Sequence, residues 1–348
     1  MQTLVSMNEK TSYALSVIRV FATLCIFLCH AVQLSGSALL QKSGQIFNVG
    51  VPMFMMLSGF LFALKPAPAS YRIWFKNRII RILVPYYLFL LFLLLVHVIC
   101  AGIDSISQVQ WFLYVVPLQG FTQDYINGAE HLWFVTDILL CYLLTPLLYS
   151  LQRKLENRKK RWLLLVIVLY FAVLLSSVFC LPAIVSTTIV TVFSYMIGFL
   201  FMKSLLSLRC YVFVITMFTA VALRVSANLV IDGTLLYDRL IAPVSHQLLG
   251  LSIFCWLFLL TCKYHELLFR VKRIVLSVDC VSYEIYLVHY MFITGPLTIR
   301  FFPVGGLNIL LLLLVTAGVA VALHVFSDKL VKRLRGRKSG SFYDRNFK

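Results

Sequence analysis

Arg19 and His30 lie in the first long apolar segment of the chain, residues 12–32. An ionisable side chain at membrane depth costs roughly 2.5–3.5 kcal/mol on insertion scales, so such residues usually have a function. The eleven-residue spacing is close to three helical turns, which places both side chains on nearly the same helix face, about 16 Å apart along the axis. One helix would thus carry a cation at one depth and a titratable imidazole at another, as expected for a reaction site inside a membrane.

Two further apolar segments contain ionisable residues. Asp137 lies about two turns into the span that begins at His131, where a lone carboxylate is unfavourable, and it could orient a histidine as carboxylates do in nucleophile-activating triads. Glu284 and His289 lie inside a late span. A topology count places His30, Asp137 and His289 in the outer halves of their helices, so we predict that these three residues are catalytic.

Other ionisable residues in the spans have simpler explanations. A lone histidine is more often a hydrogen-bonded core residue than a functional group, and we expect this for His97, His246 and His324. Arg224 lies near the outer part of its span and could either serve the site or extend its charge to the membrane surface.

Arg78 and Arg81 precede the third span and share a helix face because they are three residues apart. Guanidinium groups bind phosphate oxygens bidentately, which suits a phosphate-rich cofactor on the cytoplasmic side. Spacing alone favours a simpler role as a positively charged anchor of the helix. Similarly, Ser58 could serve only close helix packing next to Gly59, and Trp133 could belong to an interfacial aromatic belt.

The composition places these residues in a membrane protein. The chain has 348 residues, of which 61% are hydrophobic and 13% charged, whereas soluble domains are about 45–50% apolar and 25% charged. Long continuous apolar runs indicate helices rather than the short alternating strands of a barrel. We therefore predict an all-α polytopic bundle of about ten spans: 12–33, 46–64, 83–101, 131–150, 162–180, 184–202, 210–230, 246–262, 274–297 and 307–327.

The formal net charge of +18 follows the predicted topology. When alternate loops are assigned to alternate sides, 26 of the 31 lysines and arginines fall on one side, three on the other and two inside spans. Positive residues stay cytoplasmic, so both termini are expected inside, and the charge indicates contact with anionic lipids rather than nucleic acid. We expect a transmembrane domain over residues 1–328 and a basic cytoplasmic tail over residues 329–348.

The cysteines and the longest loop give further information on the site and the fold. The nine cysteines lie in or at the ends of apolar spans without a CxxC pair, so neither disulfides nor a metal site are expected. The longest outer segment is residues 102–130, and its apolar middle, residues 111–121, is too short to span and could lie over the bundle.

Five motifs, in this order along the chain, together resemble the acyltransferase-3 family of bacterial integral-membrane O-acyltransferases, which modify surface carbohydrates. The motifs are Arg19 with His30; Phe54 with Ser58-Gly59-Phe60; Arg78 and Arg81 with Pro85; His131-Leu132-Trp133-Phe134; and Ser282-Tyr283 with Tyr286-Leu287 and His289. The resemblance extends over residues 13–326, nearly the whole chain.

This resemblance implies an enzyme of the bacterial cytoplasmic membrane that moves an acyl group, most simply acetyl, from cytoplasmic acyl-CoA to a hydroxyl of a cell-surface or lipid-linked saccharide. His30 would act as general base or relay the acyl group. Arg19 would hold the donor deeper in the bundle, and Arg78 and Arg81 would bind the coenzyme A phosphates. Ser58, Trp133 and Glu284 complete the predicted substrate-binding residues, and a homo-oligomer is possible.

Two other functions fit parts of the pattern. A transporter or flippase for a saccharide or small anion would also have ionisable residues at the midplane and helices interrupted by glycine or proline, but such folds usually show paired broken helices in two related halves. A structural assembly subunit would leave the buried Arg19, Asp137 and His289 without a role.

Overall fold

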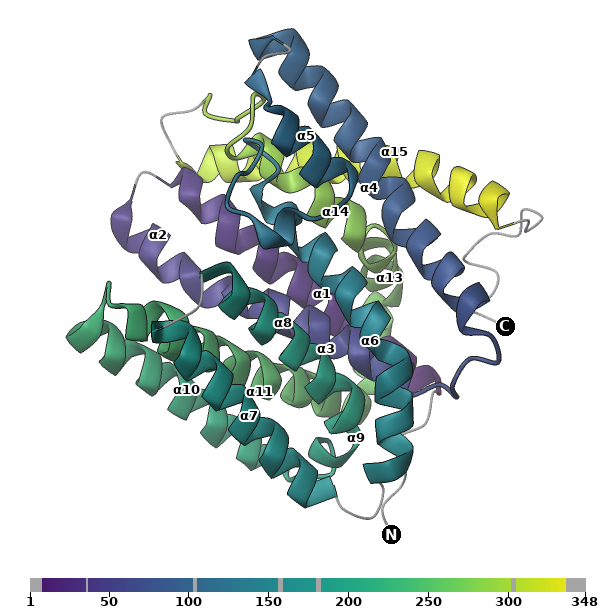
Figure 1. Cartoon of the computed structure of the whole chain (residues 1–348), viewed down its shortest axis with the longest axis vertical. Coiled ribbons are helices and arrows are strands. Elements are labelled where there is room, and N and C mark those ends of the chain that lie inside the picture. The colour runs from purple at the N-terminus through teal and green to yellow at the C-terminus, as the bar shows by residue number, and fades with distance from the viewer. Residues whose placement is uncertain are drawn as a thin grey trace.

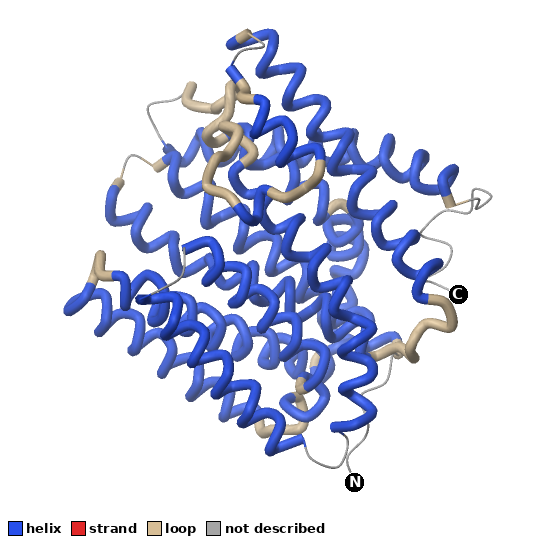
Figure 2. Tube along the Cα trace, in the orientation of Figure 1, coloured by secondary structure: helices blue, strands red, loops and turns tan. Residues whose placement is uncertain are grey.

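The computed structural model describes residues 8–35, 37–102, 105–155, 159–179, 183–301 and 305–335. Within these ranges the chain is helical and contains no strand (Figure 2). The long helices are apolar enough to cross a membrane, as a chain rich in continuous apolar runs requires, because only a helix satisfies its own backbone groups in lipid. The protein is an all-α polytopic membrane bundle.

Most of the α-helices are joined by short connections, and the two longest connections precede α6 and α15. They are α1 (Glu9–Ala31), α2 (Ala38–Gly44), α3 (Gly50–Ala63), α4 (Tyr71–Ala101), α5 (Gln108–Val115), α6 (Trp133–Leu155), α7 (Lys159–Phe179), α8 (Ala183–Leu200), α9 (Met202–Leu205), α10 (Cys210–Ile231), α11 (Ala242–Lys263), α12 (His265–Leu268), α13 (Lys272–Cys280), α14 (Ser282–Val288) and α15 (Gly305–Leu334).

Each of the ten predicted spans contains a helix, but not every helix meets the length and hydropathy expected of a span. Seven helices in the described residues do so, and an eighth span forms if His265–Cys280 and Ser282–Phe292 are taken together across their 47° bend. In α7 and α8, the described apolar stretches are the shorter Leu164–Phe179 and Thr187–Leu200. The count of ten therefore stays a prediction.

Helices α1 and α3 run through the middle of the bundle, and α3 lies directly against α8 (Figure 1). Glycines make this approach possible: a Cβ added at Gly59 would overlap the Tyr195 carbonyl, and one at Gly198 would overlap the Met56 carbonyl. The close helix contact that glycine and serine allow in the second span is thus present, between α3 and α8.

The remaining helices cover this centre on two sides. Figure 1 shows α7, α10 and α11 along one side, and α4 and α15 along the other. Helix α1 also packs against α13 and α14, while α14 lies against α15. The first span therefore contacts both halves of the broken late span, so Arg19 faces α13 and His30 faces the 3-10 turn His289–Phe292 that follows α14.

The outer segment 105–130 folds over the bundle rather than crossing it, as expected from its short apolar middle. Its helix α5 is held by the Tyr86 hydroxyl, which donates to the Tyr114 carbonyl at 2.6 Å. The Gln119 side-chain amide donates to the Leu132 carbonyl at 2.8 Å, just before α6. Phe112 on α5 is exposed, as expected of an aromatic residue in an element that lies at a membrane surface.

At the end of the bundle opposite the outer segment, the start of α1 contacts the basic segment that runs from α11 into α13. Lys272 pairs with Glu9 at 3.2 Å, and the Tyr13 hydroxyl donates to the Leu268 carbonyl at 2.6 Å. Helix α15 continues without a break to Leu334, past the predicted start of the tail at residue 329. The rest of that predicted tail, residues 336–348, lies outside the described residues.

Candidate active site

Three histidines meet where α1 ends. His30 lies in the last turn of α1, His131 in the short 3-10 turn before α6 (Glu130–Leu132), and His289 in the 3-10 turn that follows α14 (His289–Phe292). The His30 and His289 ring centroids are 5.3 Å apart, and those of His131 and His289 are 5.0 Å apart. The structure thus brings two of the three predicted catalytic residues together and adds His131.

Backbone contacts hold this histidine cluster (His30, His131 and His289) in place. His131 Nε2 lies 3.1 Å from the Leu287 carbonyl oxygen, and the Tyr286 hydroxyl donates back to the His131 carbonyl. These two bonds tie the start of α6 to α14. Gly128, with a φ of 85°, allows its loop to approach the Cα of Gly295 closely.

The hydrogen bonds fix which imidazole nitrogen carries the proton. His131 Nε2 and His289 Nδ1 both face backbone carbonyls, the latter at 2.8 Å from the Tyr286 oxygen, so both must donate. In the neutral ring the other nitrogen then presents a lone pair. His131 Nδ1 and His289 Nε2 are buried and have no hydrogen-bond partner among the described residues, so each can accept a hydrogen bond from a substrate.

His30 differs from its two neighbours because it is only partly buried. No hydrogen bond engages its imidazole within the part of the chain that the structure describes. The ring lies edge-on to Tyr290, with centroids 4.7 Å apart, and Tyr290 in turn stacks on His131. His30 is therefore the accessible imidazole of the cluster, backed by aromatic rings.

Asp137, the third predicted catalytic residue, makes no hydrogen bond to the histidine cluster among the described residues. Its carboxylate is fully buried and accepts a hydrogen bond from the Thr188 hydroxyl of α8 at 3.1 Å. Depth along the helix was predicted to bring it level with the histidines, but the direction it faces around α6 is set by the packing of α6 on α8. His131, six residues earlier in the same segment, is the residue of this segment whose ring contacts His289.

The predicted donor-binding arginines lie in a second group, nearer the basic end of the bundle. Arg81 is exposed and lies within electrostatic range of Arg78, Arg19 and Glu284. Arg19 also pairs with Asp279 of α13, whose carboxylate is 2.6 Å from its guanidinium. Asp279 falls inside the predicted ninth span, and this ionisable position was the signal that could have identified it.

Glu284 is buried and faces α15. His324 Nδ1 lies 3.0 Å from its Oε1, and the Ser327 hydroxyl donates to the same oxygen at 3.4 Å. The other nitrogen of His324 contacts the Cys280 sulfur at 3.2 Å. His324 is therefore a hydrogen-bonded core histidine, as predicted, but one that links Glu284 to α13.

The other predicted residues have local partners. The Ser58 hydroxyl donates to the Phe54 carbonyl of its own helix at 2.9 Å. The Trp133 ring packs against Phe134, with centroids 6.3 Å apart. His97 contacts the Asn127 carbonyl at 2.7 Å, as expected of a core histidine. None of these hydrogen bonds or ring contacts reaches the histidine cluster.

His246 and Arg224, two ionisable residues of the predicted spans, contact each other. The His246 Nε2 atom lies 3.1 Å from the Gln45 carbonyl and also contacts the Arg224 guanidinium. Arg224 therefore has a partner inside the bundle. In the described residues, no three histidine, cysteine, aspartate or glutamate side chains are placed to hold a metal ion.

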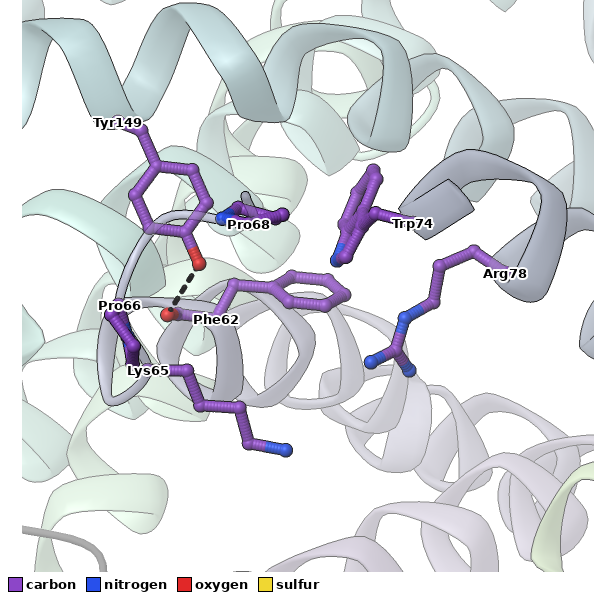
Figure 3. A pocket seen from close by; sticks show the side chains of 7 residues that line it. All are labelled: Phe62, Lys65, Pro66, Pro68, Trp74, Arg78 and Tyr149. Atoms are coloured by element: carbon purple, nitrogen blue, oxygen red, sulfur yellow. Dashed lines mark hydrogen bonds between the residues drawn. The ribbon is translucent and has the colours of Figure 1, made fainter. Parts of the chain in front are cut away.

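A pocket of about 280 Å³ opens beside the arginine group (Figure 3). Seven residues line it: Phe62, Lys65, Pro66, Pro68, Trp74, Arg78 and Tyr149. The Arg78 guanidinium lies over the Phe62 ring, 4.9 Å from its centroid. Burial, together with the charges of Arg78 and Arg81, lowers the pKa of Lys65, which lies in the loop between α3 and α4. This pocket combines aromatic walls with an excess of positive charge.

The bundle thus has two groups of candidate functional side chains, the arginine group and the histidine cluster, connected by α1. Eleven residues separate Arg19 from His30, or about 16 Å of helix. The comparisons with known proteins agree with an enzyme of this kind. A family model described as an acyltransferase domain matches residues 12–325. No curated protein and no solved structure matches the chain. The chain belongs to the acyltransferase-3 family and is a multi-pass membrane acyltransferase.

Proposed function

We propose that this acyltransferase moves an acetyl or similar acyl group from cytoplasmic acyl-CoA to a hydroxyl of a cell-surface or lipid-linked saccharide, in a bacterial cytoplasmic membrane. The observation that carries the proposal is the placement of Arg19 and His30 on one helix, each within a group of similar side chains. A cationic group suits the phosphates of the donor, and an imidazole group suits proton transfer at a hydroxyl.

The chemistry follows from the accessible imidazole. His30 removes the proton from the acceptor hydroxyl as its oxygen attacks the thioester carbonyl. The tetrahedral adduct then expels the coenzyme A thiolate, which takes the proton from His30, so that one ester forms and one thioester breaks. Positioned imidazole catalysis of this kind typically contributes about 10²–10⁴-fold in rate.

The two buried imidazoles suit a polyhydroxylated acceptor. His131 Nδ1 and His289 Nε2 are buried lone pairs without partners in the described residues, so each gains a hydrogen bond when a sugar hydroxyl enters. A saccharide supplies several such donors at once. In this arrangement the neighbouring hydroxyls orient the sugar, and His30 acts on the one that is acylated.

The test replaces His30 with alanine and measures acylation of surface glycans by mass spectrometry, at matched protein levels in the membrane. His265→Ala is the matched control, because His265 packs against Tyr13 and Phe269 at the other end of the bundle. We expect loss of acylation in His30→Ala only. Full acylation in that variant would exclude His30 as the base.

A transporter would give a different result. In membrane vesicles, withholding acyl-CoA should abolish the function of an acyltransferase and leave a transporter working. Glycan flux that continues without any acyl-CoA would therefore favour the transport alternative.

A further inference from the structure

The pocket between α3 and α4 has an apolar half and a cationic half. Figure 3 shows Trp74, Pro68 and Tyr149 around one side of the Phe62 ring, with the Lys65 and Arg78 side chains extending along the other. Phe62 and Trp74 pack edge to face, with centroids 5.2 Å apart, and the Tyr149 hydroxyl donates to the Phe62 carbonyl at 2.9 Å. These contacts hold the aromatic wall in a fixed shape.

The cationic half carries an excess of positive charge within the described part of the chain. No carboxylate pairs with Lys65 or Arg78 among the described residues. Arg81, one helical turn further along α4, adds a third positive charge nearby. Burial and these two arginines lower the pKa of Lys65, which means that they destabilise its ammonium form. An anion that enters the pocket would stabilise this ammonium form. The pocket therefore favours a ligand with both an aromatic ring and a phosphate.

The position of the pocket matches the shape of a coenzyme A thioester. The pantetheine arm between its pyrophosphate and its sulfur has about a dozen bonds, equal to about four peptide residues or roughly 14 Å when extended. That length is close to the rise of about 16 Å between Arg19 and His30. With the thioester at His30, the pyrophosphate lies near Arg19 and Arg81. The nucleotide must then lie further toward the basic end, where the pocket opens.

The size of the pocket suits part of a coenzyme A molecule. Sites that enclose a whole drug-sized ligand have volumes of about 300–1,000 Å³, and the pocket measures about 280 Å³. It is large enough for a base with its ribose but not for the whole donor. Aromatic side chains bind a base by stacking, at about 1–3 kcal/mol per base.

We propose that this pocket is the nucleotide subsite of the acyl donor: Trp74 stacks on the adenine beside the wall that the buried Phe62 forms, while Lys65 and Arg78 hold the 3′-phosphate. The inference rests on the proposed function, because it takes acyl-CoA as the donor. It adds a second recognition element that is independent of the histidine cluster and that distinguishes coenzyme A from shorter thioesters.

The first experiment compares two donors in purified protein: acetyl-CoA and S-acetyl-pantetheine, which lacks the nucleotide. Trp74→Ala should raise KM for acetyl-CoA about tenfold, in line with the loss of one stacking contact, and should leave KM for acetyl-pantetheine unchanged. Trp74→Phe should restore much of the lost affinity. Trp111→Ala, in the outer helix α5, is the matched control. An equal rise for both donors, or no rise for acetyl-CoA, overturns the proposal.

The second experiment tests the phosphate. Wild-type protein should prefer acetyl-CoA over its 3′-dephospho form, and Lys65→Met should reduce that preference several-fold because a charge-assisted contact is lost. Lys76→Met is the control, since Lys76 is exposed on α4, the helix that carries Trp74 and Arg78, and does not line the pocket. An unchanged preference in Lys65→Met would show that Lys65 does not bind the 3′-phosphate.

A binding measurement separates this inference from the proposed reaction. Adenosine 3′,5′-bisphosphate should bind wild-type protein in calorimetry, and the binding should weaken about tenfold in Trp74→Ala, whether or not acyl transfer occurs. Normal acyl transfer with no such binding overturns the subsite alone. Absence of transfer from any acyl-CoA, with the bisphosphate still bound at Trp74, refutes the proposed function and leaves the nucleotide site in place.

Discussion

The ion pair between Arg19 and Asp279 allows the structural and catalytic roles of Arg19 to be separated. The Arg19 guanidinium lies 2.6 Å from the Asp279 carboxylate, and the side chains are 25% and 13% exposed. The Ser16 hydroxyl donates to the second carboxylate oxygen at 2.8 Å. A predicted donor-binding residue is therefore also a packing element between α1 and α13, and loss of activity in Arg19→Ala alone would not distinguish the two roles.

The burial of the Arg19–Asp279 pair sets the expected loss of unfolding free energy when the pair is broken. Removing one partner of a buried pair costs about 3–5 kcal/mol, because the other charge is left without compensation. Water reaches part of Arg19, which reduces the penalty, so we expect Asp279→Ala to lower the free energy of unfolding by about 2–3 kcal/mol. The double variant Arg19→Met/Asp279→Leu removes both charges and should unfold within about 1 kcal/mol of wild type.

The assay combines unfolding in mixed micelles with acyl transfer from acetyl-CoA. If Arg19 binds the donor, the double variant regains stability but not activity. If Arg19 only packs the bundle, the double variant regains both. Recovery of transfer in Arg19→Met/Asp279→Leu would therefore refute the donor role of Arg19. A stability loss below about 0.5 kcal/mol in Asp279→Ala would refute the argument from burial.

Three further predictions use other parts of the bundle. His289→Gln should lower kcat about 100-fold in acyl-transfer kinetics while leaving KM for the donor unchanged, because in the proposed function its free nitrogen binds the acceptor rather than the donor. Gly198→Val should unfold the protein at a markedly lower temperature, since its side chain would overlap the Met56 carbonyl, whereas Gly318→Val, with open space around it, should not. Burial and the charges of Arg78 and Arg81 lower the pKa of Lys65, so stability should rise as the pH approaches the ordinary lysine value of 10.5; Lys65→Met should remove that rise in thermal midpoints measured against pH.

The sequence predicts the bundle well because the membrane imposes strong constraints on it. Continuous apolar runs identify the helices, and the distribution of lysine and arginine predicts how these helices alternate across the membrane. The depth of a residue along a helix follows from residue rise alone. For this reason His30 and His289, from the two ends of the chain, could be predicted at one level, and their rings do lie 5.3 Å apart.

The direction in which a residue faces around its helix is less predictable. Asp137 has suitable depth, but α8 supplies Thr188 as its partner. His131 lies in a 3-10 turn, where helical periodicity gives no information on facing. Asp279 and Arg19 meet because α13, the first half of the bent late span, packs against α1. In each case the missing information is a packing contact between spans that are distant in the sequence.

Asp137 offers a direct test of this difference between depth and facing. A carboxylate that orients a catalytic histidine loses about 10⁴-fold in kcat when it is changed to asparagine, because the histidine adopts the wrong tautomer. In this bundle the carbonyls of Leu287 and Tyr286 already fix the tautomers of His131 and His289. Asp137→Asn keeps an oxygen for the Thr188 hydroxyl, so kcat should stay within about threefold of wild type, far from the loss expected of a triad. A loss of a thousandfold or more in acyl-transfer kinetics, with normal folding, would show that Asp137 acts on the histidines after all. The backbone carbonyls would then not be sufficient to set their protonation.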